Sequence, residues 1–370
     1  MKILIIHNFY QSSSPSGEDI VFKNEVELLR KNRINVITYE KYNDDIANDS
    51  NRLKLAFRTI WSRETYKELK TLITKEKPDI AHFHNIWYQI SPSAYYACKD
   101  AGIPVVQTLH NFRLFCASGL LMRVGKVCEE CIGRMPWKGA FYGCYRNSRL
   151  YSLPVALTQV IHRFIGTWTN KVDAYIALTN FGRNKFIEHG LPAEKIFVKP
   201  NFLLNSHNPP LAGSEIKFCV QPVGAIHELP LDIINGQRLS EQYQSENNLS
   251  KGDRKFSHGN YIVFLGRISY EKGIEILVDA FKMLRSMTHK EVFLKIVGDG
   301  PLKKQIEDRV GIERIPNIEF TGRKSHSESM EILKDALFMV TSSIWYEMFP
   351  MTVLETFSCG KAVIAPRLGR

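Results

Sequence analysis

The stretch YIVFLGRISYEKGIEILVDAF, residues 261–281, decides the fold of the second half of the chain. Its first five residues are apolar, as in a strand that is buried on both faces. Apolar residues then return at helical spacing, and Gly266 and Arg267 stand where the strand ends. Because a strand leads directly into a helix, the stretch predicts one unit of a parallel α/β sheet.

The same alternation of strand and helix continues on both sides of this stretch. After it, short apolar runs predict strands at Phe293–Val297, Ile318–Phe320, Leu337–Thr341 and Ala362–Ala365. Before it, they predict strands at Ile3–Ile6, Asn35–Tyr39, Pro78–Phe83, Val105–Leu109, Ala174–Leu178 and Ile196–Val198, with a helix that carries Val21, Phe22, Val26 and Leu29 on one face. The sequence therefore predicts two open, doubly wound α/β sheets.

The division into domains follows from the length and from a change in composition. At roughly 150 residues per domain, a chain of 370 residues predicts two domains. Residues 206–258 show no sustained periodicity and are rich in Ser, Glu, Asn, Gln and Gly. We therefore expect an N-terminal domain over 1–205, an inserted and disordered linker over 206–258, and a C-terminal domain over 259–370.

The composition limits the class of protein. With 44% hydrophobic and 24% charged residues, the chain is not a disordered protein, a collagen-like repeat or a coiled coil. Its formal net charge of +11 favours anionic partners. It shows neither the pattern of a signal peptide nor an apolar stretch long enough to span a membrane, and its seven cysteines do not suggest a secreted disulfide framework. These features predict a cytoplasmic protein.

Two cations flank the junction between the predicted strand and helix of residues 261–281. Arg267 follows the strand, and Lys272 precedes the helix. Ligands of open α/β sheets bind beyond the carboxyl ends of the strands, and cations beside a helix N-terminus can bind a diphosphate. The alternative is that both are ordinary surface residues of a basic protein.

A second stretch, EMFPMTVLE at residues 347–355, carries two carboxylates eight positions apart. Glu347 lies in a predicted loop and Glu355 in the helix that follows, so each can accept hydrogen bonds from paired hydroxyls of a sugar ring. The backbone between them lies near a helix start and can face phosphate. This backbone comprises Phe349, Pro350, Met351 and Thr352. The alternative is two unrelated surface glutamates.

Together, GRISYEKG, EMFPMTVLE and GKAVIAPRLG resemble motifs of the retaining glycosyltransferases of family 4. The resemblance covers nearly the whole chain outside residues 206–258. It implies the GT-B fold, in which two Rossmann-like domains face a cleft. Those enzymes continue beyond the last strand predicted here, so we expect a second domain that is incomplete and a chain that is truncated at its C-terminus.

The resemblance assigns donor binding to the C-terminal domain. Glu347 would act in catalysis by holding hydroxyls of the transferred sugar, and Glu355 would hold the hydroxyls of the ribose. Other positions would bind the rest of the nucleotide. These are Arg267 and Lys272 for the diphosphate, Gly298 and Gly322 in the turns beside the nucleotide, and Phe349, Pro350, Met351 and Thr352 for the phosphates.

The N-terminal domain would supply the acceptor side. In the turn Ser16-Gly17-Glu18-Asp19, Gly17 would approach the donor phosphate, and a serine replaces the other glycine of the family's usual pair. His110 matches the family's active-site histidine and would be catalytic; the alternative is a structural histidine at a strand end. His82 and His84 are expected to be architectural. The first strand is not followed by G-x-G-x-x-G, which argues against a dinucleotide oxidoreductase.

The resemblance implies a hexosyltransferase that moves a sugar from a nucleotide-sugar to a saccharide or lipid-linked acceptor with retention, in cell-surface polysaccharide synthesis. No Asp-x-Asp motif lies near the donor motifs, so we expect transfer without a metal or another catalytic cofactor. The alternatives are a non-catalytic relative that binds sugar nucleotide or a partner, a zinc-containing nucleic-acid binder, and a sugar-nucleotide epimerase of the same fold. Nucleic acid would not explain the two glutamates, so it is not the expected partner.

Four cysteines form a separate motif. Cys116, Cys128, Cys131 and Cys144 include one C-x2-C pair, a spacing typical of a structural zinc site. Four thiolates would leave no open position on the ion, so the predicted role is structural. The alternative is free thiols in an irregular loop.

Residues 51–77 contain eight Lys or Arg and three Glu. They predict a basic amphipathic helix with Phe57, Trp61, Leu69 and Leu72 roughly on one face. Such a helix can lie on an anionic membrane and would provide a peripheral contact at its inner face. The alternative is a solvated surface helix that packs on the N-terminal sheet.

Overall fold

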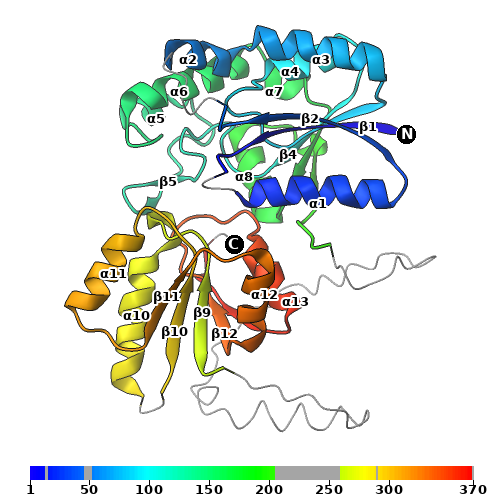
Figure 1. Cartoon of the computed structure of the whole chain (residues 1–370). Helices are drawn as coiled ribbons and strands as arrows, with labels where there is room; N and C mark the ends of the chain where they lie inside the picture. Colours follow the sequence, from blue (N-terminus) through cyan, green and yellow to red (C-terminus); the bar gives the residue numbers. More distant parts are fainter. Residues whose placement is uncertain (13–15, 46–51, 205–258, 289–290, 369–370) are drawn as a thin grey trace. The chain divides into compact units, whose positions relative to one another are not determined.

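The computed structural model describes residues 1–12, 16–45, 52–204, 259–288 and 291–368. The linker predicted over 206–258 lies outside these residues. The described residues form two larger parallel sheets, and we describe each by itself (Figure 1). The predicted cleft between two domains stays a prediction.

The first sheet has six parallel strands in the order β2-β1-β3-β4-β7-β8. They are β1 Lys2–Phe9, β2 Asn35–Tyr42, β3 Ile80–Phe83, β4 Val105–Leu109, β7 Ala174–Ala177 and β8 Ile196–Val198. Leu4, Ile5 and Ile6 in β1 are fully buried. The continuous apolar run that predicted this strand therefore reflects burial on both faces.

Helices follow the strands of this sheet in turn. They are α1 Gly17–Lys31, α2 Arg52–Ile60, α3 Arg63–Glu76, α4 Ser93–Lys99, α5 Trp137–Phe141, α6 Arg149–Phe164, α7 Thr167–Asn170, α8 Asn180–His189 and the 3-10 helix η1 Ala193–Lys195. Between β4 and α6 lies a small hairpin of β5 Met122–Arg123 and β6 Lys126–Val127. None of the helices in the described ranges combines the length and the apolar character that crossing a membrane requires.

The prediction of one amphipathic helix in residues 51–77 is wrong. The segment forms α2 and α3, because Ser62 caps α3 by accepting a hydrogen bond from the Thr65 amide. Phe57 and Leu69 of the predicted face therefore lie on two separate helices and in different environments. Leu69 in α3 is fully buried in the core, whereas the Phe57 side chain in α2 is 70% exposed.

The second sheet has five parallel strands in the order β11-β10-β9-β12-β13. The strands are β9 Tyr261–Leu265, β10 Phe293–Val297, β11 Ile318–Gly322, β12 Phe338–Val340 and β13 Ala362–Ile364. The helices are η3 Tyr270–Lys272, α10 Ile274–Met287, α11 Lys303–Ile312, α12 His326–Asp335 and α13 Met351–Ser358. The predicted pair of doubly wound α/β sheets is confirmed, and neighbouring β10, β9 and β12 end at the same edge.

Candidate active site

Backbone hydrogen bonds join the loops that follow β9, β10 and β12. The Ile268 amide donates to the Asp299 carbonyl over 2.9 Å, and the Leu302 amide donates to the Ile268 carbonyl over 3.1 Å. The Ile344 amide donates to the Glu271 carbonyl over 2.9 Å. These bonds assemble one continuous site at the carboxyl edge of the second sheet, where parallel α/β sheets bind ligands.

Two glycines allow these loops to approach closely. A Cβ atom on Gly298, whose φ is +145°, would lie 1.9 Å from the Gly266 carbonyl oxygen. A Cβ atom on Gly273, whose φ is +62°, would lie 2.0 Å from the Ser342 carbonyl oxygen. No other residue fits either position without displacing backbone. The amide of Gly298 also donates to the carbonyl of Gly322 over 2.9 Å, so these two predicted site residues lie together.

Lys272 and Glu347, which are 75 positions apart in the chain, form an ion pair at this edge. Lys272 Nζ lies 2.5 Å from Glu347 Oε1. The same oxygen accepts hydrogen bonds from Ser343 Oγ over 2.6 Å and from Trp345 Nε1 over 3.0 Å. Glu347 Oε2 accepts none from the described residues. The pair thus places one cation and one available carboxylate oxygen side by side.

Arg267 stands at the same edge without a side-chain partner among the described residues. Its side chain is exposed at the end of β9, next to Gly266. A guanidinium in this position can bind an anionic ligand without first breaking an ion pair. Both predicted cations, Arg267 and Lys272, therefore lie at this edge, and Lys272 is held by Glu347.

Helix α13 brings the other predicted donor-binding residues to this edge. It begins at Met351 after Pro350, and no side chain caps it, so the amides of Met351 and Thr352 start the helix without a side-chain acceptor. Glu355, one turn further on, is buried, and this burial raises its pKa. His326 Nδ1 lies 3.5 Å from Glu355 Oε1. A buried carboxyl group with so few partners can accept hydrogen bonds from hydroxyls.

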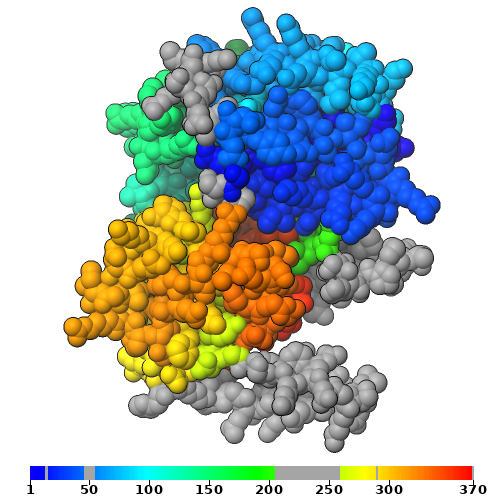
Figure 2. Space-filling view, viewed as in Figure 1, coloured from blue at the N-terminus to red at the C-terminus, as the bar shows by residue number. Residues whose placement is uncertain are grey.

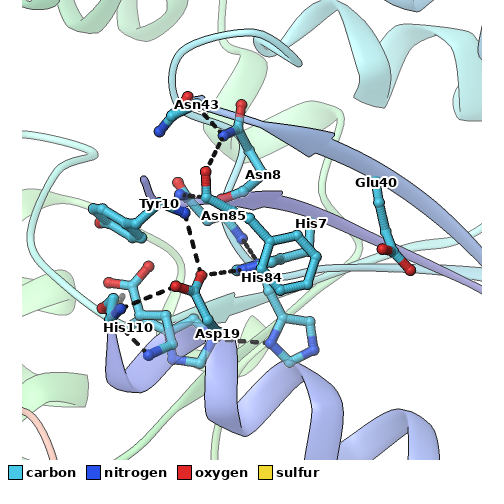
Figure 3. A network of polar contacts seen from close by, with 12 residues as sticks. His7, Asn8, Tyr10, Asp19, Glu40, Asn43, His84, Asn85 and His110 are labelled. Atoms are coloured by element: carbon cyan, nitrogen blue, oxygen red, sulfur yellow. Dashed lines mark hydrogen bonds and ion pairs between the residues drawn. The ribbon is translucent and has the colours of Figure 1, made fainter. Parts of the chain in front are cut away.

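In the first sheet, polar side chains gather where β1, β3 and β4 end (Figure 3). The Asn85 amide donates to His7 Nδ1 over 3.3 Å, so the proton of a neutral His7 lies on Nε2. His7 Nε2 then donates to Asp19 Oδ1 over 2.8 Å. Asp19 Oδ2 accepts from the Ser16 amide over 2.9 Å and completes the capping box of α1. The serine beside Gly17 therefore serves as the N-cap of this helix.

His110 lies in direct contact with His84. His84 Nδ1 and His110 Nε2 are 2.9 Å apart, and the two rings are stacked. Burial, followed by the neighbouring histidines, holds the pKa of both imidazoles well below the ordinary value. Both rings are therefore neutral near pH 7, and they share one proton between these two nitrogens.

Glu25 determines which ring carries that proton. His84 Nε2 and Glu25 Oε2 are buried, lack a hydrogen bond within the described structure, and face each other at 3.5 Å. Glu25 Oε1 forms an ion pair with Lys199 Nζ at 3.1 Å. A lone pair on His84 Nε2 would repel this carboxylate, so the proton of His84 lies on Nε2. His84 Nδ1 then accepts from His110 Nε2, which leaves His110 Nδ1 with a lone pair.

Exchanging Glu25 for glutamine is expected to reverse both tautomers. Lys199 donates to the Oε1 position, which keeps the amide oxygen there and turns the amide NH2 toward His84 Nε2. His84 then carries its proton on Nδ1, and His110 carries its proton on Nδ1 as well. Two-bond 1H–15N spectra of the chain labelled with 15N-histidine distinguish the tautomers. Glu27→Gln, on the exposed face of α1, is the control; an unchanged His110 pattern in Glu25→Gln would contradict the assignment.

Glu18, Asn111 and Arg113 line a cavity of about 30 Å³ that His84 and His110 also line. Asn111 Nδ2 donates to Glu18 Oε1 over 2.7 Å, and Glu18 Oε2 is buried. Burial raises the pKa of Glu18 to about 7. A carboxyl group that titrates near neutral pH beside His110 can take up or release a proton.

The raised pKa of Glu18 predicts a pH-dependent stability. Between pH 4.5, its ordinary pKa, and about 7, the folded chain keeps a proton on Glu18 that the unfolded chain has lost. The free energy of unfolding therefore falls through this group as the pH rises across that interval. In Glu18→Gln this component is absent, so urea unfolding of the variant should depend less on pH; identical pH dependences would contradict the prediction.

Sequence reasoning did not assign Glu18, Glu25 or Arg113 to the site, and it expected His84 to be only architectural. One signal was available for Glu25, because it falls within the apolar stripe of Val21, Phe22 and Val26 on α1. A carboxylate on the inward face of a helix requires a polar partner in the core.

Glu25, His82 and His84 form a group that could hold a metal ion, since one ligand atom from each lies within 4.8 Å of the others. Among the described residues, this is the one set of three or more His, Cys, Asp or Glu side chains whose ligand atoms lie this close together. The Lys199 ammonium, however, already pairs with the carboxylate of Glu25. We therefore assign this group to the placement of protons rather than to a metal.

The four predicted zinc ligands lie in the long segment that connects β4 to α6. Cys116 and Cys131 are buried, Cys128 and Cys144 are half-buried, and all four thiols are free. Burial first, and then the other three thiols, raise the pKa of Cys131 to about 12. No three of these four sulfur atoms lie within 4.8 Å of one another, so the zinc site stays a prediction.

Family models match both halves of the chain. Residues 27–203 match the model described as Glycosyltransferase Family 4, and residues 245–369 match the model described as Glycosyl transferases group 1. Together, the two matched ranges include every strand of both larger sheets except β1, which precedes residue 27.

Two curated relatives show how far the similarity extends. An uncharacterized glycosyltransferase of Methanocaldococcus jannaschii is 36% identical over 110 residues, which cover 30% of this chain and 29% of that protein. The lipopolysaccharide 1,2-N-acetylglucosaminetransferase of Salmonella typhimurium is 27% identical over 186 residues, which cover 45% of this chain and 48% of that protein. The chain thus spans less than half the length of either relative.

Solved structures show the same architecture. HepE of Anabaena in complex with UDP and glucose aligns with a TM-score of 0.54 and 16% identity, covering 100% of this chain and 81% of that one. Sucrose-phosphate synthase of Thermosynechococcus elongatus aligns with a TM-score of 0.58 and 15% identity, and the alignment covers 100% of this chain and 82% of that one. These solved structures show that the chain has the GT-B fold, and the two family models, which together match most of the chain, identify it as a protein of the glycosyltransferase group.

Proposed function

We propose that the chain is a retaining hexosyltransferase that uses a nucleotide-sugar donor. The observation that carries the proposal is the site at the carboxyl edge of the second sheet, where Lys272 pairs with Glu347 and the exposed Arg267 has no side-chain partner within the described ranges. Two cations suit a diphosphate, and the two carboxylates Glu347 and Glu355 suit the hydroxyls of a hexose and a ribose. The solved structure of Anabaena HepE, which holds UDP and glucose, has the same fold.

In the proposed reaction, the bond between the anomeric carbon and the diphosphate oxygen breaks, and a bond from the acceptor oxygen to that carbon forms on the same face. The leaving diphosphate keeps the bonding electron pair, and its oxygen takes up the proton that the acceptor hydroxyl loses. Arg267 and Lys272 would stabilise the negative charge on that diphosphate, as a divalent cation does in other enzymes. His110 Nδ1 would accept a hydrogen bond from a sugar hydroxyl, because it carries a lone pair.

We infer the acceptor class from one of the curated relatives. The Salmonella relative is a lipopolysaccharide N-acetylglucosaminetransferase, and its alignment extends over about half of its length. We propose a saccharide or lipid-linked acceptor in cell-surface polysaccharide synthesis on this basis.

A thermal-melt panel with UDP, GDP, ADP, CMP and their common sugar conjugates tests the proposal. Specific stabilisation by one nucleotide would identify the base, and turnover of its sugar conjugate would establish transfer. Stabilisation without turnover on any saccharide or lipid acceptor would favour a non-catalytic relative that binds sugar nucleotide. A cooperative melt that no nucleotide shifts would contradict the donor site.

We also propose that Cys116, Cys128, Cys131 and Cys144 bind one structural zinc ion. Burial and then the neighbouring thiols raise the pKa of Cys131 and Cys144, and zinc would replace the protons of the four thiols and draw the sulfur atoms into its coordination sphere. The segment between β4 and α6 that carries them has little regular secondary structure, so a metal crosslink would order this segment.

Removal of this metal is expected to lower the melting temperature. Native mass spectrometry should find one zinc ion per chain, and a strong chelator should lower the midpoint by at least about 5 °C. Cys131→Ser should lose the ion, whereas Cys359→Ser, at a half-buried cysteine outside the motif, should keep it. If the metal-free wild-type chain melted at the same temperature with and without added zinc, this result would contradict the proposed zinc site.

A further inference from the structure

Helix α6, Arg149–Phe164, turns its polar side chains toward the protein. Ser152, Thr158, Gln159 and His162 are each at most 1% exposed. Gln159 Nε2 donates to the Arg113 carbonyl over 2.7 Å, and His162 Nε2 donates to the Ile60 carbonyl over 2.9 Å. The inward face of this helix is therefore fixed by hydrogen bonds to neighbouring backbone.

The outward face of α6 is apolar. Leu150 is 68% exposed, Leu153 44%, Ile161 37% and Phe164 83%. With the half-buried Leu157, these residues recur at intervals of three and four positions and form one stripe along the helix. A helix that packs on a core normally shows the reverse arrangement, so within the described residues this stripe lacks the partner that its composition requires.

Neighbouring helices extend the stripe. Helices α2 and α5 both pack against α6, and they add the exposed side chains of Phe57, Trp137 and Phe141. We call the seven exposed side chains the α6 surface: Phe57, Trp137, Phe141, Leu150, Leu153, Ile161 and Phe164. In Figure 2, the green atoms of this part of the chain lie open on the molecular surface at the left.

Only basic residues carry charge in this part of the sequence. Residues 131–172 contain six Lys or Arg and no Asp or Glu. Arg134, Lys138, Arg146 and Arg149 are exposed, and the Arg149 guanidinium lies 5.2 Å from the centre of the Phe141 ring. Apolar and cationic side chains are thus interleaved on the same face.

We infer that the α6 surface lies on a membrane that contains anionic lipid. Leucine, isoleucine and phenylalanine side chains would enter the boundary between headgroups and acyl chains, while the exposed arginines would contact lipid phosphates. Lys138 already pairs with Glu130 at 2.6 Å. Trp137 has the amphipathic character that suits this boundary. The face differs from the one predicted over residues 51–77, of which it keeps only Phe57. A second protein chain would not require so uniform a positive charge.

Sedimentation with lipid vesicles tests the inference. The full chain should bind vesicles of phosphatidylcholine with phosphatidylglycerol and bind pure phosphatidylcholine much more weakly. The double variant Leu150→Glu and Phe164→Glu should lower binding at least about tenfold, since it places two anions within the stripe. Arg146→Glu with Arg149→Glu should mainly reduce the preference for anionic lipid.

Ile312→Glu is the matched control, because Ile312 is 82% exposed on α11, outside the α6 surface. All variants change exposed side chains, and their cooperative melts should match that of the wild type. Failure of the wild-type chain to bind anionic vesicles at low salt would overturn the inference. So would light scattering that shows wild-type dimers and monomeric Leu150→Glu/Phe164→Glu, since a second copy of the chain would then cover this face.

Discussion

Lys272→Met is expected to lower kcat/KM for the donor by about 100-fold to 1,000-fold, a loss of about 3–4 kcal/mol of transition-state stabilisation. Two effects combine. The variant removes one of the two cations that face the diphosphate, and it leaves Glu347 without the ammonium that now lies 2.5 Å from Oε1. Steady-state kinetics with the nucleotide-sugar identified in the melt panel would measure the loss.

Lys304→Met provides the control for this variant. Lys304 is an exposed lysine on α11, away from the ion pair, so its replacement should leave kcat/KM within about twofold. If Lys272→Met kept the wild-type kcat/KM and the wild-type melting temperature, the cation would not act on the donor. Loss of the cooperative melt would show instead that the ion pair is chiefly structural.

Gly298→Ala is expected to lower the free energy of unfolding by at least about 3 kcal/mol. The added methyl group would lie 1.9 Å from the Gly266 carbonyl oxygen, so the backbone after β9 or β10 must move. The positive φ of +145° adds strain for any residue with a side chain. Because Arg267 follows Gly266, we also expect weaker nucleotide binding in any fraction that folds. Chemical unfolding and the melt panel measure the two effects separately.

Gly311→Ala is the matched control for this substitution. Gly311 lies inside α11 without a positive φ, and a Cβ atom there would meet nothing within 4 Å. Alanine should therefore stabilise the chain by roughly 0.5–1 kcal/mol through its higher helix propensity. Equal stabilities of Gly298→Ala and the wild type would show that the loops at the sheet edge can separate at no cost.

Local patterns predicted the elements of the fold well. The strands at 105–109, 196–198 and 293–297 have the predicted bounds, because short runs of apolar and β-branched residues favour strands even in β8, where Phe197 and Val198 are exposed. Residues 51–77 were mispredicted because a helical period continues across the cap at Ser62, and a local pattern does not show that Leu69 meets the core while Phe57 does not. Periodicity predicts which residues share a helix face but not where the helix stops.

Contacts between distant residues could not be predicted in the same way. The sequence singled out Lys272 and Glu347 for separate parts of the donor, whereas the structure pairs them because β9 and β12 are neighbours in the sheet. His110 was predicted through the family resemblance. Its partner His84 directly follows β3 and Glu25 lies in α1, and only the strand order brings them together. The outward apolar stripe of α6 was not predicted, because Gln159, His162 and Arg163 interrupt the apolar residues along the chain and the stripe becomes visible only at helical spacing.

The three hydrogen bonds to Glu347 Oε1 have a consequence for which sugar epimers the chain would accept. Ser343, Trp345 and Lys272 hold that oxygen, so a bound hexose can approach only Oε2 without displacing one of them. A single acceptor atom in a fixed position favours one orientation of one ring hydroxyl. Inverting that hydroxyl, as between two epimeric hexoses, would leave the hydroxyl and the carboxylate oxygen unpaired. The stereochemical preference of the donor site would then depend on side chains that never touch the sugar.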